Sequence, residues 1–232
     1  DADYGRGVVL PHPFTLVLLV EMDPDEMQSA PRAPVIRESA LQYLRGARIA
    51  MTVAAALRAV GYDATPHYDA HYDVMLPPLA VAGGLGELGR HNMLITDRVG
   101  TRSRIGAVTT TAPLRPASRR RLGVERFCRS CRKCADNCPS HALSSDAPGP
   151  INGITKWPTH VERCYGYWRT VGTDCGICMA VCPFSHRDTR WHNVVRRLVR
   201  LMPWAARLFV WGDDLVYGRR WVGTRDRGPG TG

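Results

Sequence analysis

All eight cysteines of this 232-residue chain lie behind residue 127, and their spacing constrains the fold more than any other feature. The first four form the run Cys-x2-Cys-x2-Cys-x3-Cys-Pro, and the last four form Cys-x10-Cys-x2-Cys-x3-Cys-Pro. A chain of this length can bury a core without disulfides, so four disulfide bonds are a poor explanation. Thiolates repeated at steps of three can instead surround one soft metal centre. The spacing therefore predicts metal chemistry in the C-terminal half.

The two cysteine runs are typical of proteins that hold two cubane iron–sulfur clusters. In bacterial ferredoxins the fourth cysteine of such a run, the one before proline, ligates the other cluster. We therefore expect two [4Fe-4S] clusters, each with three ligands from one run and one from the other. This assigns Cys128, Cys131, Cys134 and Cys182 to the first cluster, and Cys138, Cys164, Cys175 and Cys178 to the second.

Structural zinc is the competing interpretation, because pairs of Cys-x2-Cys also make sites with four thiolate ligands. Triple runs that end in Cys-Pro are typical of iron–sulfur proteins and not of zinc ribbons. Two clusters in one fold form a short path for the transfer of single electrons. Their reduction potentials depend on burial and on hydrogen bonds to sulfur. Such an electron-transfer path implies that a reaction centre or a partner protein receives the electrons at its end.

The cysteine-free front half predicts mixed α and β structure. Residues 14–22 contain a short apolar block and predict a strand, and residues 104–109 predict another. Residues 37–60 repeat apolar side chains every three or four positions, so they predict a helix that ends before Gly61. Residues 63–74 predict a polar loop.

The segment GGLGELGR, residues 83–90, formally matches a dinucleotide-binding fingerprint. That fingerprint needs a helix opening directly after it and an acidic residue about 20 positions later. Here the predicted strand HNMLIT follows, and residues 104–112 contain no Asp or Glu. We therefore reject a Rossmann site.

Charge bears mainly on the choice of partners. Lys and Arg number 31 against 21 Asp and Glu, a net charge of +10 that would steer anionic partners toward the chain. The longest apolar run, residues 14–20, is far shorter than the roughly 20 residues of a membrane-spanning helix. Residues 191–211 predict a basic amphipathic helix, broken at Pro203, that packs back on the domain rather than on a membrane.

Longer blocks of the chain resemble the corrinoid iron–sulfur reductive dehalogenases. FCRSCRKCADNCPS, CYGYWRTVGTDCGICMAVCPFSH and DDLVYGRRW resemble three C-terminal blocks of that family, while LAVAGGLGELGRHNMLIT and RIGAVTTTAPL resemble its cobalamin-binding half. The epoxyqueuosine reductases share this plan and are more distant. The resemblance implies an α/β (α+β) fold, with a partial nitroreductase-like cobalamin-binding domain followed by a ferredoxin-like domain.

The resemblance also implies a division of the chain into three parts. Residues 1–115 would be the C-terminal half of the cobalamin-binding catalytic domain, residues 116–190 the two-cluster domain, and residues 191–232 a helical tail. Because catalytic domains of the family exceed 127 residues and no Met start or signal peptide is present, we expect the chain to be the C-terminal part of a longer protein.

By the same resemblance, cobalamin reduced through the clusters would remove halogen from an organohalide, and a tyrosine would supply a proton. Tyr43 is the best match, on a helix face it shares with Ala47, Ala50 and Ala54. Spacing alone favours packing of this face against a sheet. The family's nearby arginine corresponds to Arg104, or alternatively to Arg102, and its charge is expected to favour the phenolate.

Backbone groups around residues 83–93 would cradle the corrin or its nucleotide tail. The residues concerned are Gly84, Leu85, Gly86, Glu87, Leu88, Gly89, Arg90 and Met93. The polar loop lacks an Asn that the family often carries, and its four aromatic residues could line a substrate pocket or be plain surface. They are His67, Tyr68, His71 and Tyr72.

The expected partners are an organohalide, an electron-donor protein or quinol-linked chain, and a small membrane-anchor subunit; nucleic acid is not expected. The expected location is the exported side of a membrane, with the cytoplasm as the alternative. Two other functions stay open at this point. A ferredoxin-type electron carrier needs only the cysteines, and an epoxyqueuosine reductase-like enzyme would explain the positive charge.

Overall fold

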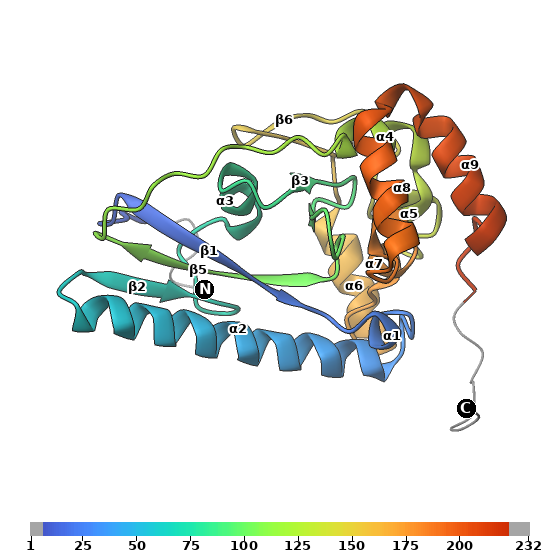
Figure 1. Ribbon diagram of the computed structural model, residues 1–232. Coiled ribbons are helices and arrows are strands. Elements are labelled where there is room, and N and C mark those ends of the chain that lie inside the picture. The colour runs from blue at the N-terminus through green and yellow to red at the C-terminus, as the bar shows by residue number, and fades with distance from the viewer. Residues whose placement is uncertain (1–6, 223–232) are drawn as a thin grey trace.

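A three-stranded antiparallel sheet forms the centre of the front half in the computed structural model, which describes residues 7–222 (Figure 1). Its middle strand β5 (Ser103–Thr110) lies between β1 (Phe14–Glu21) and β2 (Ala64–His67). The sequence predicted β1 and β5, and both are confirmed. It was wrong about residues 63–74, where β2 pairs with β5 from Ala64↔Thr110 to His67↔Ala107. β2 is an edge strand, which explains how it tolerates Pro66.

Helices cover both faces of this sheet. The long helix α2 (Ala33–Ala59) follows the short α1 (Pro24–Met27) and packs on one face, where its Ala50 and Ala54 meet Leu18 and Val108. Helix α3 (Leu76–Ala82) packs on the other face, where Val17, Leu19 and Ile105 point. Alternate residues of β1 therefore serve opposite layers, as the period of a strand requires.

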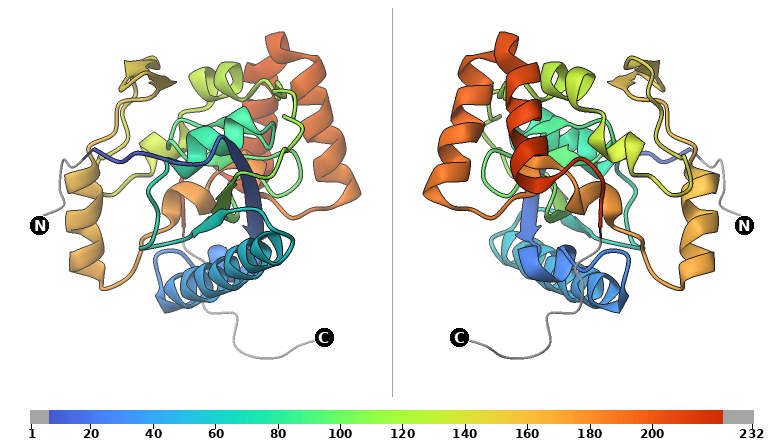
Figure 2. Two further views of the ribbon diagram at one scale, coloured as in Figure 1. Left: turned by 90° about the vertical axis from the view of Figure 1, so that its left-hand side faces the viewer. Right: turned by 90° about the vertical axis from the view of Figure 1, so that its right-hand side faces the viewer.

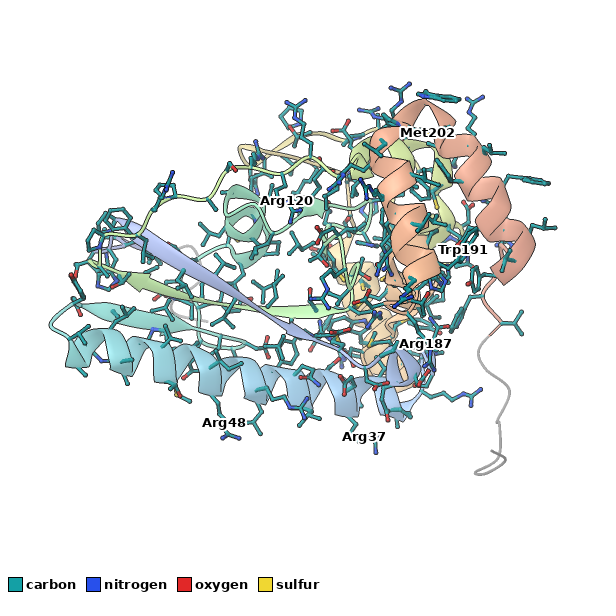
Figure 3. All side chains as sticks on the ribbon, viewed as in Figure 1. Arg37, Arg48, Arg120, Arg187, Trp191 and Met202 are labelled. Carbon is teal, nitrogen blue, oxygen red and sulfur yellow. The ribbon has the colours of Figure 1, made fainter. Side chains whose placement is uncertain are left out.

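Helix α2 begins four residues earlier than predicted, because Pro34 fits the first turn of a helix. Its buried face also differs from the predicted apolar stripe, since Leu41, Leu44 and Met51 are exposed. The buried positions carry small or polar side chains: Val35, Glu38, Ser39, Gln42, Gly46, Ala50 and Ala54. Arg37 and Arg48 point away from the sheet on the outer side (Figure 3). Ala50 and Ala54 thus serve tight packing on the sheet.

A small hairpin, β3 (Glu87–Leu88) and β4 (Leu94–Ile95), follows α3, and the glycine-rich segment leads into it. Gly84 has a φ of +75°, and a Cβ there would lie 2.4 Å from the carbonyl oxygen of Ser118. A Cβ at Gly86 would lie 2.2 Å from the carbonyl oxygen of Ile95. The glycines are thus required by close approach of the chain to itself.

The cysteine-rich region is built from short elements joined by tight turns. In chain order they are α4 (Val124–Cys131), α5 (Lys133–Asp136), β6 (Gly149–Ile151), β7 (Ile154–Lys156), α6 (Val161–Val171), α7 (Ile177–Ala180) and the 3-10 helix η1 (Pro183–Ser185). Figure 2 shows α6 and the β6–β7 hairpin on one side of the molecule and the C-terminal helices on the opposite side. The mixed α and β fold predicted from the sequence is confirmed.

Helices α8 (Arg190–Leu201) and α9 (Ala206–Tyr217) form the C-terminal pair, separated by η2 (Pro203–Ala205). The predicted helix and its break at Pro203 are confirmed. Val199, Ala206 and Val210 pack against α4 in the same core as Phe127, so the pair docks on the cysteine-rich region. Trp191, Trp204 and Trp211 remain exposed on its outer surface. Across residues 7–222, none of the helices has the length and apolar character needed to span a bilayer.

Candidate iron–sulfur and catalytic sites

The eight cysteines, all of them free thiols, lie in two groups. Cys128 and Cys131 lie close enough to Cys134 and Cys182 for their charges to raise the pKa values of these two thiols. All four thiols line one cavity. In the same way, the charges of Cys138 and Cys164 raise the pKa values of Cys175 and Cys178. The structure thus brings together the same two sets of four that the sequence predicted as ligands. Cys134 also couples to Cys178, so the two groups are neighbours.

Tight backbone turns bring the first group together. Cys128 and Cys131 lie one turn apart on α4, and Arg132 then takes a φ of +58° that reverses the chain into α5 and Cys134. Cys182 arrives from the end of α7, directly before Pro183. The backbone N–H groups of Lys133 and Phe184 lower the pKa values of Cys131 and Cys182, and in the second group the backbone N–H of Ala142 donates to Cys138 Sγ at 3.3 Å. Such N–H donors orient thiolates and stabilise negative charge on them.

Burial makes these thiols hard to ionise without a metal. It raises the pKa of Cys128 to about 12 and that of Cys131 and of Cys175 to about 11. The pKa values of Cys134, Cys178 and Cys182 are also raised, first by burial and then by neighbouring sulfurs. Iron would supply the positive charge that four adjacent buried thiolates need, so the donor set fits iron–sulfur clusters. Within residues 7–222, no group of three or more His, Cys, Asp or Glu side chains is arranged to hold a single ion.

A second constellation surrounds Tyr43 on α2. The guanidinium carbon of Arg104, from β5, lies 4.5 Å from the centre of the Tyr43 ring. Arg104 Nη2 donates to Ser39 Oγ at 2.5 Å and to Asp174 Oδ2 at 3.1 Å, and Ser39 Oγ donates to the same Asp174 oxygen at 2.7 Å. Asp174 directly precedes Cys175, so this network joins the tyrosine to the second cysteine group.

Ser39 and Asp174 were not predicted. Ser39 could have been found, because it lies four residues before Tyr43 and therefore on the same helix face. Asp174 gave no such signal, since it is 135 residues from Ser39 in the chain. Arg104 Nε and Asp174 Oδ1 are buried and have no hydrogen-bond partner among the described residues.

Arg102, the alternative partner of Tyr43, has a different role. Its side chain is 1% exposed, donates to the carbonyl oxygens of Ser185 at 2.7 Å and Met22 at 2.8 Å, and pairs with Glu21 at 3.3 Å. These bonds tie the start of β5 to η1 and to the end of β1. The structure therefore brings Arg104, and not Arg102, beside Tyr43.

Burial raises the pKa of Tyr43 above its usual value near 10, and this effect outweighs the lowering by Arg104. The expected effect of the arginine is present, because Arg104 lowers the pKa, but burial outweighs it, and the sequence does not show how deeply the ring is buried. Asp69, Asp174 and Tyr72 raise the pKa further. Tyr43 thus keeps its proton at neutral pH.

We expect ultraviolet difference spectroscopy to show Tyr43 ionising above pH 10, with Tyr43→Phe as the reference that removes its signal. Arg104→Met should raise this pKa further, because it removes the positive charge that lowers it. Since the folded-state pKa exceeds the unfolded value, the contribution of Tyr43 to stability is complete below about pH 10. It is lost as the pH rises through the folded-state pKa. A Tyr43 pKa below that of a free phenol would contradict this assignment.

In the segment whose backbone is predicted to contact cobalamin, most side chains make contacts within the protein. Leu85 and Leu88 pack with Ala80, and Met93 packs beside the core of the second cysteine group. Glu87 Oε2 accepts from the backbone N–H groups of Leu122 and Val124, both at 2.9 Å, at the start of α4. These side chains hold the hairpin against the cysteine-rich region. A role for its backbone groups in binding a corrin stays a prediction.

The side chain of Arg90, in the same segment, also makes its contacts within the protein. It is 2% exposed and donates to the carbonyl oxygens of Cys128 at 3.1 Å, Ser144 at 2.8 Å and Asp146 at 3.0 Å. Its guanidinium also lies over the Trp157 ring, 5.6 Å from the ring centre. Arg90 thus secures the loop of the first cysteine group.

The four aromatic residues of the predicted polar loop separate into different roles. His67 is buried and hydrogen-bonded to Thr109 Oγ1 at 3.0 Å, and Tyr68 packs against the sheet core. The His71 ring lies tilted beside Tyr68, with 5.2 Å between ring centres. Tyr72 is exposed, and its charge affects Tyr43. Of the four, only Tyr72 adjoins the tyrosine constellation through these interactions.

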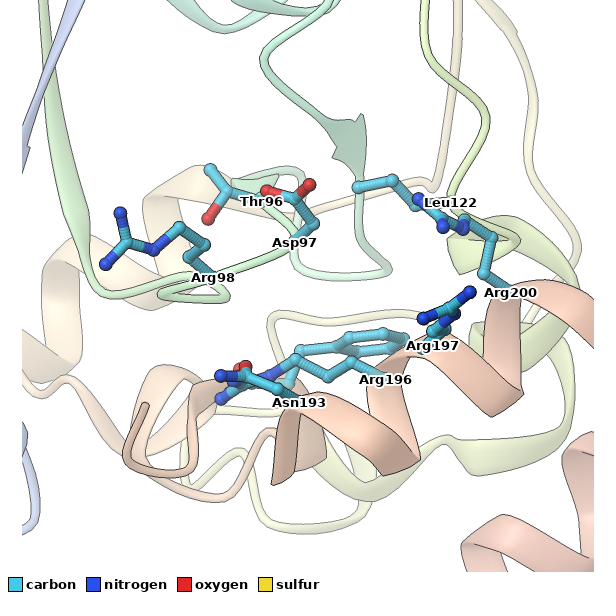
Figure 4. Close-up of a pocket in the computed structure, with 9 residues that line it drawn as sticks. Thr96, Asp97, Arg98, Leu122, Asn193, Arg196, Arg197 and Arg200 are labelled. Atoms are coloured by element: carbon cyan, nitrogen blue, oxygen red, sulfur yellow. Dashed lines mark hydrogen bonds between the residues drawn. The ribbon is translucent and has the colours of Figure 1, made fainter. Parts of the chain in front are cut away.

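A pocket rich in arginine lies between the turn at residues 96–98 and helix α8 (Figure 4). It contains none of the predicted catalytic residues. Asp97 pairs with Arg120 at 2.9 Å, and Arg98 pairs with Asp188 at 3.1 Å. The remaining charge of the pocket is positive, from Arg196, Arg197 and Arg200.

Comparisons with known proteins agree with this geometry. Residues 127–186 match a family described as a 4Fe-4S dicluster domain, which confirms iron–sulfur clusters over the zinc alternative. A tetrachloroethene reductive dehalogenase of Desulfitobacterium hafniense is 36% identical over 208 residues, 84% of this chain and 37% of that protein. An epoxyqueuosine reductase of Synechococcus is 30% identical over 177 residues, 70% of this chain and 50% of that protein.

Among solved structures, the catabolic reductive dehalogenase NpRdhA superposes with a TM-score of 0.84 at 31% identity, covering 90% of this chain and 31% of that chain. The chain therefore spans about a third of the length of the dehalogenases it matches. The similarity extends on both sides of the dicluster region, because it covers far more of the chain than residues 127–186.

Proposed function

Because this chain is a homologue of part of the reductive dehalogenases, we propose that it takes part in reductive removal of halogen from an organohalide. Electrons would arrive singly through two [4Fe-4S] clusters, and cobalamin would be the cofactor. The observation that carries the proposal is the continuity from Tyr43 through Arg104 to Asp174, the residue before Cys175. A proton source and an electron path thereby meet at one point of the fold.

The proposed ligands of the first cluster are Cys128, Cys131, Cys134 and Cys182, and those of the second are Cys138, Cys164, Cys175 and Cys178. The grouping of the thiols and the backbone N–H donors to sulfur support this assignment. When bound, cobalamin supplies the reducing metal centre that attacks the halogenated substrate. The unpartnered Arg104 Nε and Asp174 Oδ1 beside Tyr43 support a polar guest at this point. Backbone groups of residues 83–93 are the proposed corrin contacts.

In this proposal Tyr43 holds the proton that the product carbon needs after the halide leaves. The raised pKa of Tyr43 supports this role, because the phenol stays protonated at neutral pH. Arg104 offsets part of the effect of burial, so that the phenolate left behind is stabilised by a neighbouring positive charge. Ser39 and Asp174 hold Arg104 over the ring and act as positioning residues.

Tyr43→Phe is expected to lower the rate of halide release by about 100-fold, because it removes a general acid. Iron and corrinoid content should stay unchanged, since the ring still packs under Arg104. Tyr62→Phe, at the exposed end of α2, is the matched control and should retain full activity. Full activity of the Tyr43 variant would exclude it as the proton donor.

The experiment that tests the function is anaerobic expression with cobalamin, followed by measurement of iron, sulfide, corrinoid and halide release. About eight iron atoms and one corrinoid per chain, with halide release from organohalides, would support the proposal. Eight iron atoms without corrinoid binding would favour the ferredoxin-type carrier. Corrinoid binding with turnover of epoxyqueuosine alone would favour the more distant relatives.

The remaining assignments rest on the homologues and on surface chemistry. We propose an electron-donor protein or quinol-linked chain and a small membrane-anchor subunit as partners, at the exported side of a membrane. The exposed Trp191, Trp204 and Trp211 beside the arginines of α8 support contact with an apolar or anionic surface. The boundaries 1–115, 116–190 and 191–232 are proposed as domain limits.

A further inference from the structure

His91 lies in the wall of the cavity that the first cysteine group surrounds. Cys128, Cys131, Cys134 and Cys182 line this cavity together with the His91 ring. The side chain of His91 is 7% exposed, and its Nε2 has no hydrogen-bond partner within residues 7–222. A buried polar nitrogen without a partner is costly, so a native structure normally provides one.

The contacts of the ring determine which nitrogen carries the proton. The backbone N–H of Met93 donates to His91 Nδ1 at 3.2 Å, so Nδ1 is the acceptor. In a neutral imidazole the other nitrogen is then the donor, which makes Nε2 an N–H group. Burial disfavours the imidazolium and lowers the pKa of His91 to about 4, consistent with the neutral ring.

The ring has little freedom to turn away from the cavity. A Cβ at Gly89 would lie 2.7 Å from His91 Cε1 and 3.2 Å from Nδ1, so the chain passes close to this edge of the ring. That close passage is a physical reason for glycine at position 89. With Nδ1 engaged and Cε1 close to the backbone, Nε2 is left as the ring nitrogen without a partner, in a residue that lines the cavity of the four cysteines.

We propose that His91 Nε2–H donates a hydrogen bond to a sulfur of the first iron–sulfur cluster, and thereby makes this cluster easier to reduce. The inference rests on the ligand assignment proposed above, and not on cobalamin or on a halogenated substrate. Reduction adds negative charge to the cluster, so a hydrogen-bond donor to sulfur stabilises the reduced state more than the oxidised state. The donor is a positioning and tuning group of the electron path.

The test is an electron paramagnetic resonance redox titration of the full chain after anaerobic reconstitution with iron and sulfide. His91→Phe keeps an aromatic ring of similar shape and removes the N–H. We expect it to lower the ratio of reduced to oxidised first cluster about tenfold at a given potential, which is about 59 mV for a one-electron couple. The second cluster serves as an internal reference and should keep its potential.

His71→Phe is the matched control, because His71 lies beside Tyr68 in the loop near the sheet. It should leave both potentials unchanged. Iron and sulfide content is measured first in every variant, so that failure of the ligand assignment, seen as missing iron in the unchanged protein, is separate from failure of the inference. An unchanged first potential in a fully loaded His91→Phe protein would overturn the inference, as would an equal shift of both clusters.

A second measurement covers the case in which His91→Phe does not load its first cluster. The unsubstituted protein is prepared with ¹⁵N-labelled histidine, and the reduced first cluster is examined by electron–nuclear double resonance in H₂O and in D₂O. We expect a ¹⁵N coupling together with a strongly coupled proton that exchanges with deuterium. Absence of both couplings at the first cluster would overturn the inference on its own.

Discussion

Cys182→Ala should abolish the first iron–sulfur cluster and leave the second, halving the iron content from about eight atoms per chain to about four. Cys182 is buried and belongs to the second cysteine run. The thiols whose charges raise its pKa are nevertheless those of Cys128 and Cys131, in the first run. Alanine removes one of the four thiolate ligands and supplies no donor atom in its place. Iron analysis and electron paramagnetic resonance of the reduced protein provide the measurement.

Cys138→Ala is the reciprocal variant, because Cys138 belongs to the first run but raises the pKa values of Cys164, Cys175 and Cys178 in the second. It should abolish the second cluster and leave the first. Two further variants identify the spectra: Cys182→Ala should match Cys131→Ala, and Cys138→Ala should match Cys175→Ala. If Cys182→Ala instead matched Cys175→Ala, and Cys138→Ala matched Cys131→Ala, each run would hold its own cluster. The crossed assignment would then be wrong.

Gly100→Ala is expected to be among the most destabilising single changes in the chain. Gly100 has a φ of +60°, and a Cβ there would lie 2.0 Å from the carbonyl oxygen of Phe184 and 2.8 Å from the backbone nitrogen of Ser185. These atoms belong to η1, directly after Cys182 and Pro183, so the backbone beside the first cluster would have to move. We expect a loss of about 4 kcal/mol or more in the free energy of unfolding, together with loss of iron from the first cluster.

Gly153→Ala separates the two causes of the destabilisation, which are the left-handed backbone conformation and the clash of the added Cβ with η1. Gly153 has a φ of +75°, but a Cβ there would meet nothing within 4 Å. The left-handed conformation alone should cost about 1–2 kcal/mol. Denaturant unfolding of both variants measures the difference, which is the contribution of the contact with η1. Equal destabilisation would mean that η1 adapts without cost and that only backbone conformation matters.

The sequence was most informative where a short local pattern determines the structure. The apolar block of β1, the break at Pro203 and the cysteine runs depend on residues close together in the chain, and each led to a correct prediction. Periodicity also located α2, and the face with Ala50 and Ala54 packs on the sheet as its spacing predicted. The leucine stripe was not predictable in this way, since Leu41 and Leu44 are exposed while Ser39 and Gln42 are buried. Burial depends on what packs against a helix, and periodicity carries no information about that partner.

Features that depend on distant parts of the chain were not predictable in the same way. β2 forms because β5 offers it a ladder of hydrogen bonds, although its own residues are polar and include a proline. The partners of Tyr43 come from β5 and from the residue before Cys175, and Glu87 caps a helix 37 residues away. The family resemblance suggested Arg104, but only the fold shows that burial outweighs its charge at the phenol.

The bonds made by Glu87 and Arg90 bear on how this protein can be divided or recombined. Glu87 bonds the first residues of α4, and Arg90 bonds the carbonyl of Cys128, so the β3–β4 hairpin is part of the framework around the cysteines. Cutting the chain at residue 115 would leave those N–H and carbonyl groups without partners. An electron-transfer module grafted from this protein into another scaffold would therefore have to begin before Glu87, carrying the hairpin with it.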